Sequence, residues 1–239
     1  MINMEQEEII RVTEEFVKKQ LGKEPTGHDW WHANRVRNMA LYIVNNIDDP
    51  TDLNPFVIEL AALLHDIADW KFHGGDEDVG PTVARKWLES LGSVDSNIVN
   101  EVCAIIKGIS FKGAGVSDTC LNMNGQIVQD ADRLDSIGAI GIARTFAFGG
   151  YRHRQIYDPS ESPSFHASVL EYNQRQSSTI AHFHEKLLLL KDRMNTDIAM
   201  EIAKTRHQQM VSFLEEFHQE WDFGLREDVN FSRVLDGDT

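Results

Sequence analysis

The sequence contains little cysteine: Cys103 and Cys120 are the only two among 239 residues. Two cysteines are too few for a disulfide framework, and their spacing does not match the C-x-x-C pairs of zinc sites. A reduced compartment is the simplest setting for such a chain. We therefore expect a cytoplasmic protein that is held together by its hydrophobic core.

Basic residues are also scarce, with 23 Lys and Arg against 38 Asp and Glu and a formal net charge of −15. A protein that binds nucleic acid needs a basic surface to neutralise the backbone phosphates, so this balance argues against a nucleic-acid partner. A small anionic substrate is still compatible with the charge. A divalent cation and a few placed Lys or Arg residues can reverse the local field in one cleft.

Long hydrophobic runs and several common catalytic motifs are missing as well. The apolar stretch at residues 60–64 is far shorter than the roughly 20 residues that span a bilayer. Residues 1–8 contain three Glu and no basic residue, which is the opposite of a secretory signal. We expect no membrane partner. The sequence has no GxxxxGK[ST], GxGxxG, HExxH or GxSxG motif, which excludes P-loop, Rossmann, zincin and serine-hydrolase sites.

Helical periodicity dominates the chain, because apolar residues recur at steps of three and four and alternating strand patterns are scarce. With 41% hydrophobic residues the chain can form a substantial core. We expect an all-α fold, with one compact helical bundle at residues 1–221 and a loosely attached tail at 222–239. The pattern predicts helices at about 9–21, 28–47, 55–70, 78–91, 96–109, 126–146, 167–194 and 196–221, and an irregular segment at 147–164 of the kind that serves a site.

Four polar residues fall where these helices should be buried: His32, the adjacent His65 and Asp66, and Asp132. Buried carboxylates cost several kcal/mol each without a partner, and one divalent cation shared by neighbouring helices would remove that cost. Taken singly, each residue also has a plainer interpretation. His32 fits a core histidine, the His65–Asp66 pair fits a helix end that emerges into water, and Asp132 fits a surface charge cluster.

Three segments around these residues resemble the HD superfamily of metal-dependent phosphohydrolases. They are GHDWWHANRV at residues 27–36, LLHDIAD at 63–69 and QDADRLDSIG at 129–138. The resemblance is closest to small stand-alone bacterial members that hydrolyse nucleotides. It implies an HD-type helical bundle with one buried divalent metal ion held by His32, His65, Asp66 and Asp132. A ligand set of nitrogen and oxygen without thiolate favours manganese, with magnesium, iron, cobalt or nickel as alternatives.

The same resemblance suggests roles for two neighbouring residues. Asp69 follows His65 by four residues, so it is our candidate for the general base or for the group that orients the nucleophilic water. His28 lies one turn before His32 and is a candidate proton donor or phosphate contact. The alternative for Asp69 is a solvated carboxylate at a helix end, and for His28 a residue at a helix start without a special role.

The substrate also needs contacts of its own, for which we select Lys71, Arg35, Arg154 and Tyr151. The three cations lie near the predicted ligands or in the irregular segment, and Tyr151 could stack on a base, although aromatic residues in helices are more often core. Arg133 is turned about 100° away from Asp132, so a structural salt bridge is the better assignment for it.

The expected function is hydrolysis of a small phosphorylated substrate, specifically a nucleotide, by a metal-bound water that attacks phosphorus. The basic irregular segment carries more positive charge than one phosphate requires, which favours a nucleoside triphosphate pyrophosphohydrolase. A nucleoside 5′-monophosphate phosphatase is one alternative, and a non-catalytic metal-containing module that binds nucleotides or signals is another. Ala68 stands where a ppGpp hydrolase would be expected to carry Glu, and no ligand set for a second metal is evident. The oligomeric state is open between a monomer and a homodimer.

Overall fold

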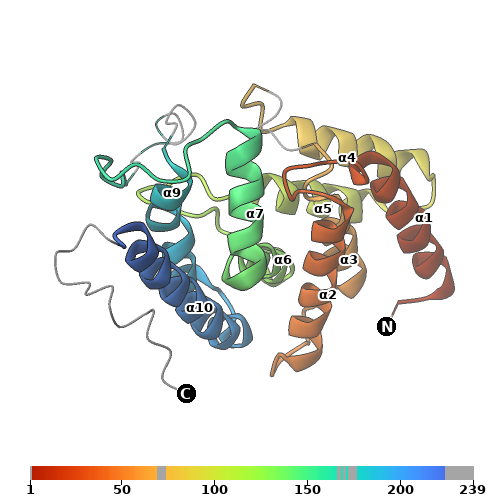
Figure 1. Ribbon diagram of the computed structural model, residues 1–239. Helices are drawn as coiled ribbons and strands as arrows, with labels where there is room; N and C mark the ends of the chain where they lie inside the picture. Colours follow the sequence, from red (N-terminus) through yellow and green to blue (C-terminus); the bar gives the residue numbers. More distant parts are fainter. Residues whose placement is uncertain (1, 69–73, 166–167, 169–170, 172–176, 224–239) are drawn as a thin grey trace, which may run out of the picture.

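The computed structural model describes residues 2–68, 74–165, 168, 171 and 177–223 (Figure 1). Within these ranges the regular elements are all helical, which confirms the predicted all-α class. They are α1 (Met4–Leu21), α2 (Trp30–Asn46), α3 (Pro55–Leu64), α4 (Val79–Ser90), α5 (Ser96–Gly108), α6 (Met123–Asp135), α7 (Gly138–Tyr151), α9 (Thr179–Glu185), the 3₁₀ helix η2 (Leu187–Arg193) and α10 (Asp197–Trp221).

Helix α3 lies at the centre of the molecule. Its nine residues from Phe56 to Leu64 are all buried, because the helix is apolar on nearly every side and contacts α1, α2, α5 and α6. The one charged member, Glu59, pairs with Arg37 of α2 at 2.7 Å. Asn54 caps its start by accepting a hydrogen bond from the Val57 amide, and Pro55 fills the first helical position, where no amide donor is needed. Helices α2 and α6 also contact each other, so α2, α3 and α6 form a central trio, with α1 and α4 on one side and α9 and α10 on the other (Figure 1).

The predicted helix at residues 126–146 is wrong, because the chain breaks there into α6 and α7. Gly138 has φ +76° and Ile137 is extended, so the backbone leaves the helical region between the two elements. The helix also runs beyond its predicted end, since α7 continues to Tyr151 and takes the first five residues of the expected irregular segment. This break allows α7 to pack against α9 and α10 as well as α6.

The long helix predicted at 167–194 is wrong as well. Among the described residues, α9 begins only at Thr179 behind the Ser178 cap, and Lys186, with φ −138° and ψ −61°, interrupts the helix before η2. Most of the segment 166–176, and the tail beyond Phe223, lie outside the described residues. The division into a domain at 1–221 and a tail therefore stays a prediction.

Asp130 of α6 holds the start of α10 in place. Its Oδ1 accepts hydrogen bonds from the backbone amide and the side-chain amide of Asn195, both at 2.8 Å, and its Oδ2 accepts two from the amide and hydroxyl of Thr196 at the same distance. Thr196 is in turn the N-cap of α10. One carboxylate with zero exposure thus joins α6, which carries a predicted ligand, to the last helix of the fold.

Candidate metal centre

His32 occupies the first turn of α2, where its side chain is fully buried. Asp29 caps this helix by accepting a hydrogen bond from the His32 amide at 2.9 Å. The cap fixes where the helix begins and hence the direction in which the imidazole points. His32 therefore lies against α3 and α6 and not at the surface.

His65 and Asp66 follow the last residue of α3 and do not lie on the helix itself, contrary to the predicted helix through residue 70. The Nδ1 of His65 lies 2.8 Å from the Ala62 carbonyl oxygen. In a continuing helix that oxygen would accept a hydrogen bond from the Asp66 amide. Here the His65 imidazole donates to it instead, so it competes with the hydrogen bond that would extend the helix. The chain turns here instead, and both side chains face α2 and α6.

The four predicted ligand atoms converge on one point between α2, α6 and the end of α3. The Nε2 atoms of His32 and His65 are 3.0 Å apart. From His32 Nε2, Asp66 Oδ2 lies at 3.2 Å and Asp132 Oδ1 at 3.4 Å, and from His65 Nε2 the same two oxygens lie at 3.5 and 3.7 Å. Two nitrogens and two oxygens thus face one another at the spacing of ligands around a single ion. The structure brings together all four residues that the sequence predicted.

The hydrogen bonds of the two imidazoles show which ring nitrogen is available. His32 Nδ1 lies 2.7 Å from Asp135 Oδ2, and His65 Nδ1 faces the Ala62 carbonyl. A carbonyl oxygen and an ionised carboxylate can only accept, so both Nδ1 atoms must donate. A neutral ring then has its lone pair on Nε2, which is the atom that points into the cluster.

These residues fit a divalent cation. Two Nε2 lone pairs that face each other at 3.0 Å repel unless a proton or a cation lies between them. The Oδ2 atom of Asp66 is buried without a hydrogen-bond partner among the described residues, so a carboxylate oxygen has been desolvated and aimed at the same point. His32, His65 and Asp66 alone form a cluster whose ligand atoms lie within 4.8 Å of one another. A site made of imidazole nitrogen and carboxylate oxygen is typical of manganese, magnesium, iron, cobalt or nickel, and not of a structural zinc ion closed by thiolates.

The electrostatics of this cluster predict that cation binding depends on pH. Burial and the charge of Arg144 lower the pKa of His32, but the nearby carboxylates of Asp132, Asp135 and Asp66 outweigh both and raise it to about 10. Without a cation His32 therefore carries a second proton, on Nε2, at neutral pH. A metal ion must displace this proton in order to bind. We expect the affinity for Mn²⁺ to fall about tenfold for each unit that the pH drops between 9 and 6.

Titration calorimetry in buffers of different ionisation enthalpy would measure this proton release directly. About one proton per bound ion is the expected value. An affinity that stays constant over this pH range, with no proton released, would contradict the prediction.

A run of ring contacts leads away from the metal centre toward the segment after α7. The rings of His32 and His28 are 5.8 Å apart, and His28 lies 5.7 Å from Phe148 of α7. The guanidinium groups of Arg154 and Arg152 lie 5.6 and 6.0 Å from the Phe148 ring. Of the predicted contacts, His28 and Arg154 thus lie on one side of the centre, and Tyr151 is the half-exposed last residue of α7.

The other predicted contacts have different positions. Arg35 donates to Asp135 from Nε at 2.7 Å and from Nη2 at 3.0 Å, so its role toward substrate stays a prediction. Asp69 and Lys71 lie outside the described residues. The structural salt bridge expected for Arg133 is confirmed, since its Nη2 lies 2.7 Å from Asp118 Oδ1.

The sequence patterns did not reveal the role of Asp135, which lies in the QDADRLDSIG segment three residues after Asp132. They also did not reveal Arg144 of α7, whose Nη1 lies 3.3 Å from Asp135 Oδ2. The spacing contained a signal for the first, because Asp135 follows Asp132 by three residues and so shares its helix face. No comparable signal existed for Arg144, which reaches the centre across the α6–α7 break.

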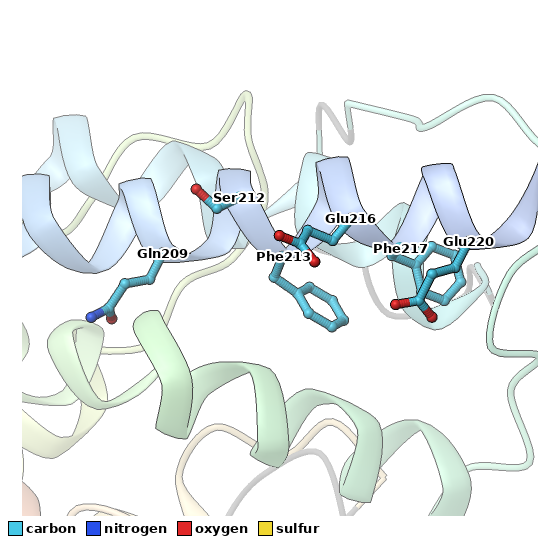
Figure 2. A pocket seen from close by; sticks show the side chains of 6 residues that line it. All are labelled: Gln209, Ser212, Phe213, Glu216, Phe217 and Glu220. Atoms are coloured by element: carbon cyan, nitrogen blue, oxygen red, sulfur yellow. The ribbon is translucent and has the colours of Figure 1, made fainter. Parts of the chain in front are cut away.

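One groove of about 390 Å³ lies elsewhere on the molecule, along α10 beside α7 (Figure 2). Phe213 and Phe217 form its apolar part, and the rest of the lining is polar or acidic. None of the predicted site residues lines it. The complete lining is Gln209, Ser212, Phe213, Glu216, Phe217 and Glu220.

None of the described helices is both long and apolar enough to cross a membrane.

Comparison with known proteins places this geometry in a family. A family model described as the HD domain matches residues 30–137. YpgQ of Bacillus subtilis (strain 168) is 36% identical over 222 residues, which cover 92% of this chain and 96% of that protein. Its crystal structure in complex with ADP superposes with a TM-score of 0.67 at 30% identity, covering 91% of this chain and 97% of that one.

Two further crystal structures agree. An HD-superfamily hydrolase from Bacillus thuringiensis superposes with a TM-score of 0.66 at 40% identity, over 91% of this chain and 98% of that one. A protein from Lactobacillus plantarum gives 0.79 at 32% identity, over 92% and 98% of the two chains. The relatives match along nearly their whole length, and the matched domain contains all four converging ligands. The chain belongs to the HD-domain family.

Proposed function

We propose that this protein is a metal-dependent hydrolase of nucleotides that converts nucleoside triphosphates to monophosphates and pyrophosphate. The observation that carries the proposal is the position of two arginines, Arg152 and Arg154, against the Phe148 ring. Phe148 contacts His28, and His28 contacts the predicted ligand His32. Two guanidinium groups lie on the same side of the centre. A single phosphate at the centre would not need both, whereas a triphosphate chain extends toward them.

The charge distribution supports an anionic substrate at this place. The chain as a whole has a net charge of −15, and the centre itself contains Asp66 and Asp132. Phosphate groups would be repelled without local positive charge, which a divalent ion and the two arginines together supply. Arginine is suited to this role because its planar fork pairs with two phosphate oxygens at once.

His32, His65, Asp66 and Asp132 would hold the ion. When bound, a divalent cation supplies a Lewis acid that activates water and neutralises developing charge on phosphoryl oxygens. His28, whose Nδ1 lies 2.9 Å from the Thr26 hydroxyl, is our candidate for donating a proton or contacting a phosphate. Asp69 stays our candidate for the base that accepts the proton of the attacking water, and Lys71 for a further phosphate contact.

YpgQ, the relative whose crystal structure contains ADP, supports a nucleotide as the ligand class. The proposal for this chain adds the reaction, namely attack at the α-phosphorus. Attack on a monophosphate, with release of inorganic phosphate, is the alternative reaction, and binding without turnover is the alternative from another class.

Product analysis tests the proposal. Protein stripped of metal would be incubated with a panel of nucleoside mono- and triphosphates, each with Mn²⁺, Mg²⁺, Co²⁺ or no metal, beside the His65→Ala variant. We expect pyrophosphate and monophosphate in equal amounts, formed only with added metal and not by the variant. Inorganic phosphate from monophosphates would make the protein a nucleotidase, and no turnover above the variant under any condition would favour the binding module.

A further inference from the structure

Asp135 at the end of α6 contacts a predicted ligand without pointing into the metal centre. Its Oδ2 accepts a hydrogen bond from His32 Nδ1 at 2.7 Å, and its side chain is only 7% exposed. The two residues are 103 positions apart in the sequence. The contact therefore exists only because α2 and α6 pack against each other.

Two arginines hold this carboxylate. Arg35 of α2 donates from Nε to Oδ1 at 2.7 Å and from Nη2 to Oδ2 at 3.0 Å. Arg144 of α7 lies with Nη1 3.3 Å from Oδ2, and its Nε donates to the Gly27 carbonyl oxygen at 2.6 Å. Asp135 is thus fixed from both sides by residues of two other elements, and its orientation does not depend on His32.

We propose that Asp135 is the positioning residue for His32: it holds the proton on Nδ1, so that Nε2 faces the cation, and it strengthens that nitrogen as a donor. The inference rests on the metal centre of the proposed function but not on its substrate or reaction. Arg35 and Arg144 support it by keeping the carboxylate ionised and in place.

The competing explanation is that Asp135 serves only to join α2, α6 and α7 through its arginines. Asp118 provides a matched control for this, because it also pairs with two arginines, Arg133 at 2.7 Å and Arg193 at 3.6 Å. Within the described part of the chain, no hydrogen bond or ion pair joins Asp118 to a predicted ligand. An effect on metal binding that is specific to Asp135 would therefore separate positioning from simple packing.

The test compares Asp135→Asn with Asp118→Asn in the full-length protein. Equilibrium competition with a chelating indicator would give the affinity for Mn²⁺, and the visible absorption bands of bound Co²⁺ would report the geometry of the centre. We expect Asp135→Asn to bind Mn²⁺ about 10- to 100-fold more weakly and to shift the Co²⁺ bands. We expect Asp118→Asn to match the wild type in both measurements.

Several outcomes would overturn the inference. A folded Asp135→Asn variant with wild-type affinity and spectrum would do so, as would equal losses in the two variants. A wild-type protein that binds no metal would refute the metal centre itself, whereas metal binding without nucleotide hydrolysis would refute only the proposed reaction.

A second measurement does not require the variant to fold. Long-range ¹H–¹⁵N correlation spectra of the wild-type protein loaded with Zn²⁺ distinguish the two ring nitrogens of each histidine. We expect His32 to carry its proton on Nδ1 and to bind through Nε2. A His32 that binds through Nδ1 would contradict the positioning role of Asp135.

Discussion

Replacing His65 by alanine is expected to abolish metal binding and, with it, turnover. The variant loses one of four ligand atoms and leaves the carboxylates of Asp66 and Asp132 facing a gap in the donor set. Charge stabilisation by a bound metal ion contributes several kcal/mol, and every 1.36 kcal/mol is a factor of ten in rate. We therefore expect kcat to fall on the order of a thousandfold or more.

Metal content after equilibrium dialysis and kcat with a triphosphate would be measured together. His207→Ala on α10 is the matched control, because it removes an imidazole that is not among the predicted ligands. Melting temperatures add an independent readout. Metal at about 100 times its dissociation constant stabilises a folded protein by roughly 2.7 kcal/mol, so a chelator should lower the melting temperature of the wild type but not of His65→Ala. Stoichiometric metal in the variant would contradict the assignment.

Replacing Asp130 by alanine is expected to have the largest effect on stability. The change removes the acceptor for all four hydrogen bonds from Asn195 and Thr196. The two Thr196 donors are then left buried, whereas Asn195 is exposed and its donors can turn to water. Each buried donor without a partner costs about 1–3 kcal/mol, and partial relaxation of the α10 start would recover some of this. We expect the free energy of unfolding to fall by about 3–5 kcal/mol.

Urea unfolding followed by circular dichroism would measure the loss. Asp158→Ala is the control, because that carboxylate also accepts from a backbone amide and a hydroxyl, both of Ser160, but at an exposed position. We expect the free energy of unfolding of this control to fall by less than about 1 kcal/mol, since water replaces the carboxylate as hydrogen-bond acceptor at the surface. Equal losses in the two variants would show that burial does not set the contribution of Asp130.

Much of the fold could be predicted from the sequence because most helices bury a clear apolar stripe. Helices α2, α5 and α10 lie close to their predicted bounds for this reason. The errors occur where a local interaction overrides periodicity. At the end of α3, the His65 imidazole hydrogen-bonds to the Ala62 carbonyl oxygen. At Gly138 a positive φ ends the helix, although the apolar pattern of the sequence continues across the break.

The candidate site also contains residues that could be predicted from the sequence and residues whose contacts could not. The four ligands could be predicted because their residue types, order and neighbouring segments resemble a known family. The partner of His32 could not be chosen from sequence alone, since Asp130, Asp132 and Asp135 all lie on α6 and only packing decides which of them meets Nδ1. Arg35 illustrates the limit: its proximity to the centre was predictable, but its pairing with Asp135 depends on the α2–α6 contact.

The separation of the ligands along the chain has a consequence for folding. His32 lies 33 residues before His65, and Asp132 lies 66 residues after Asp66, so the centre closes two long loops. Loop closure must be complete before the donors meet, and an unfolded or partly folded chain presents no comparable site. A bound ion therefore acts as a cross-link that forms late in folding. It has little effect on the folding rate, but it lowers the unfolding rate because it joins α2, α3 and α6 once they have packed.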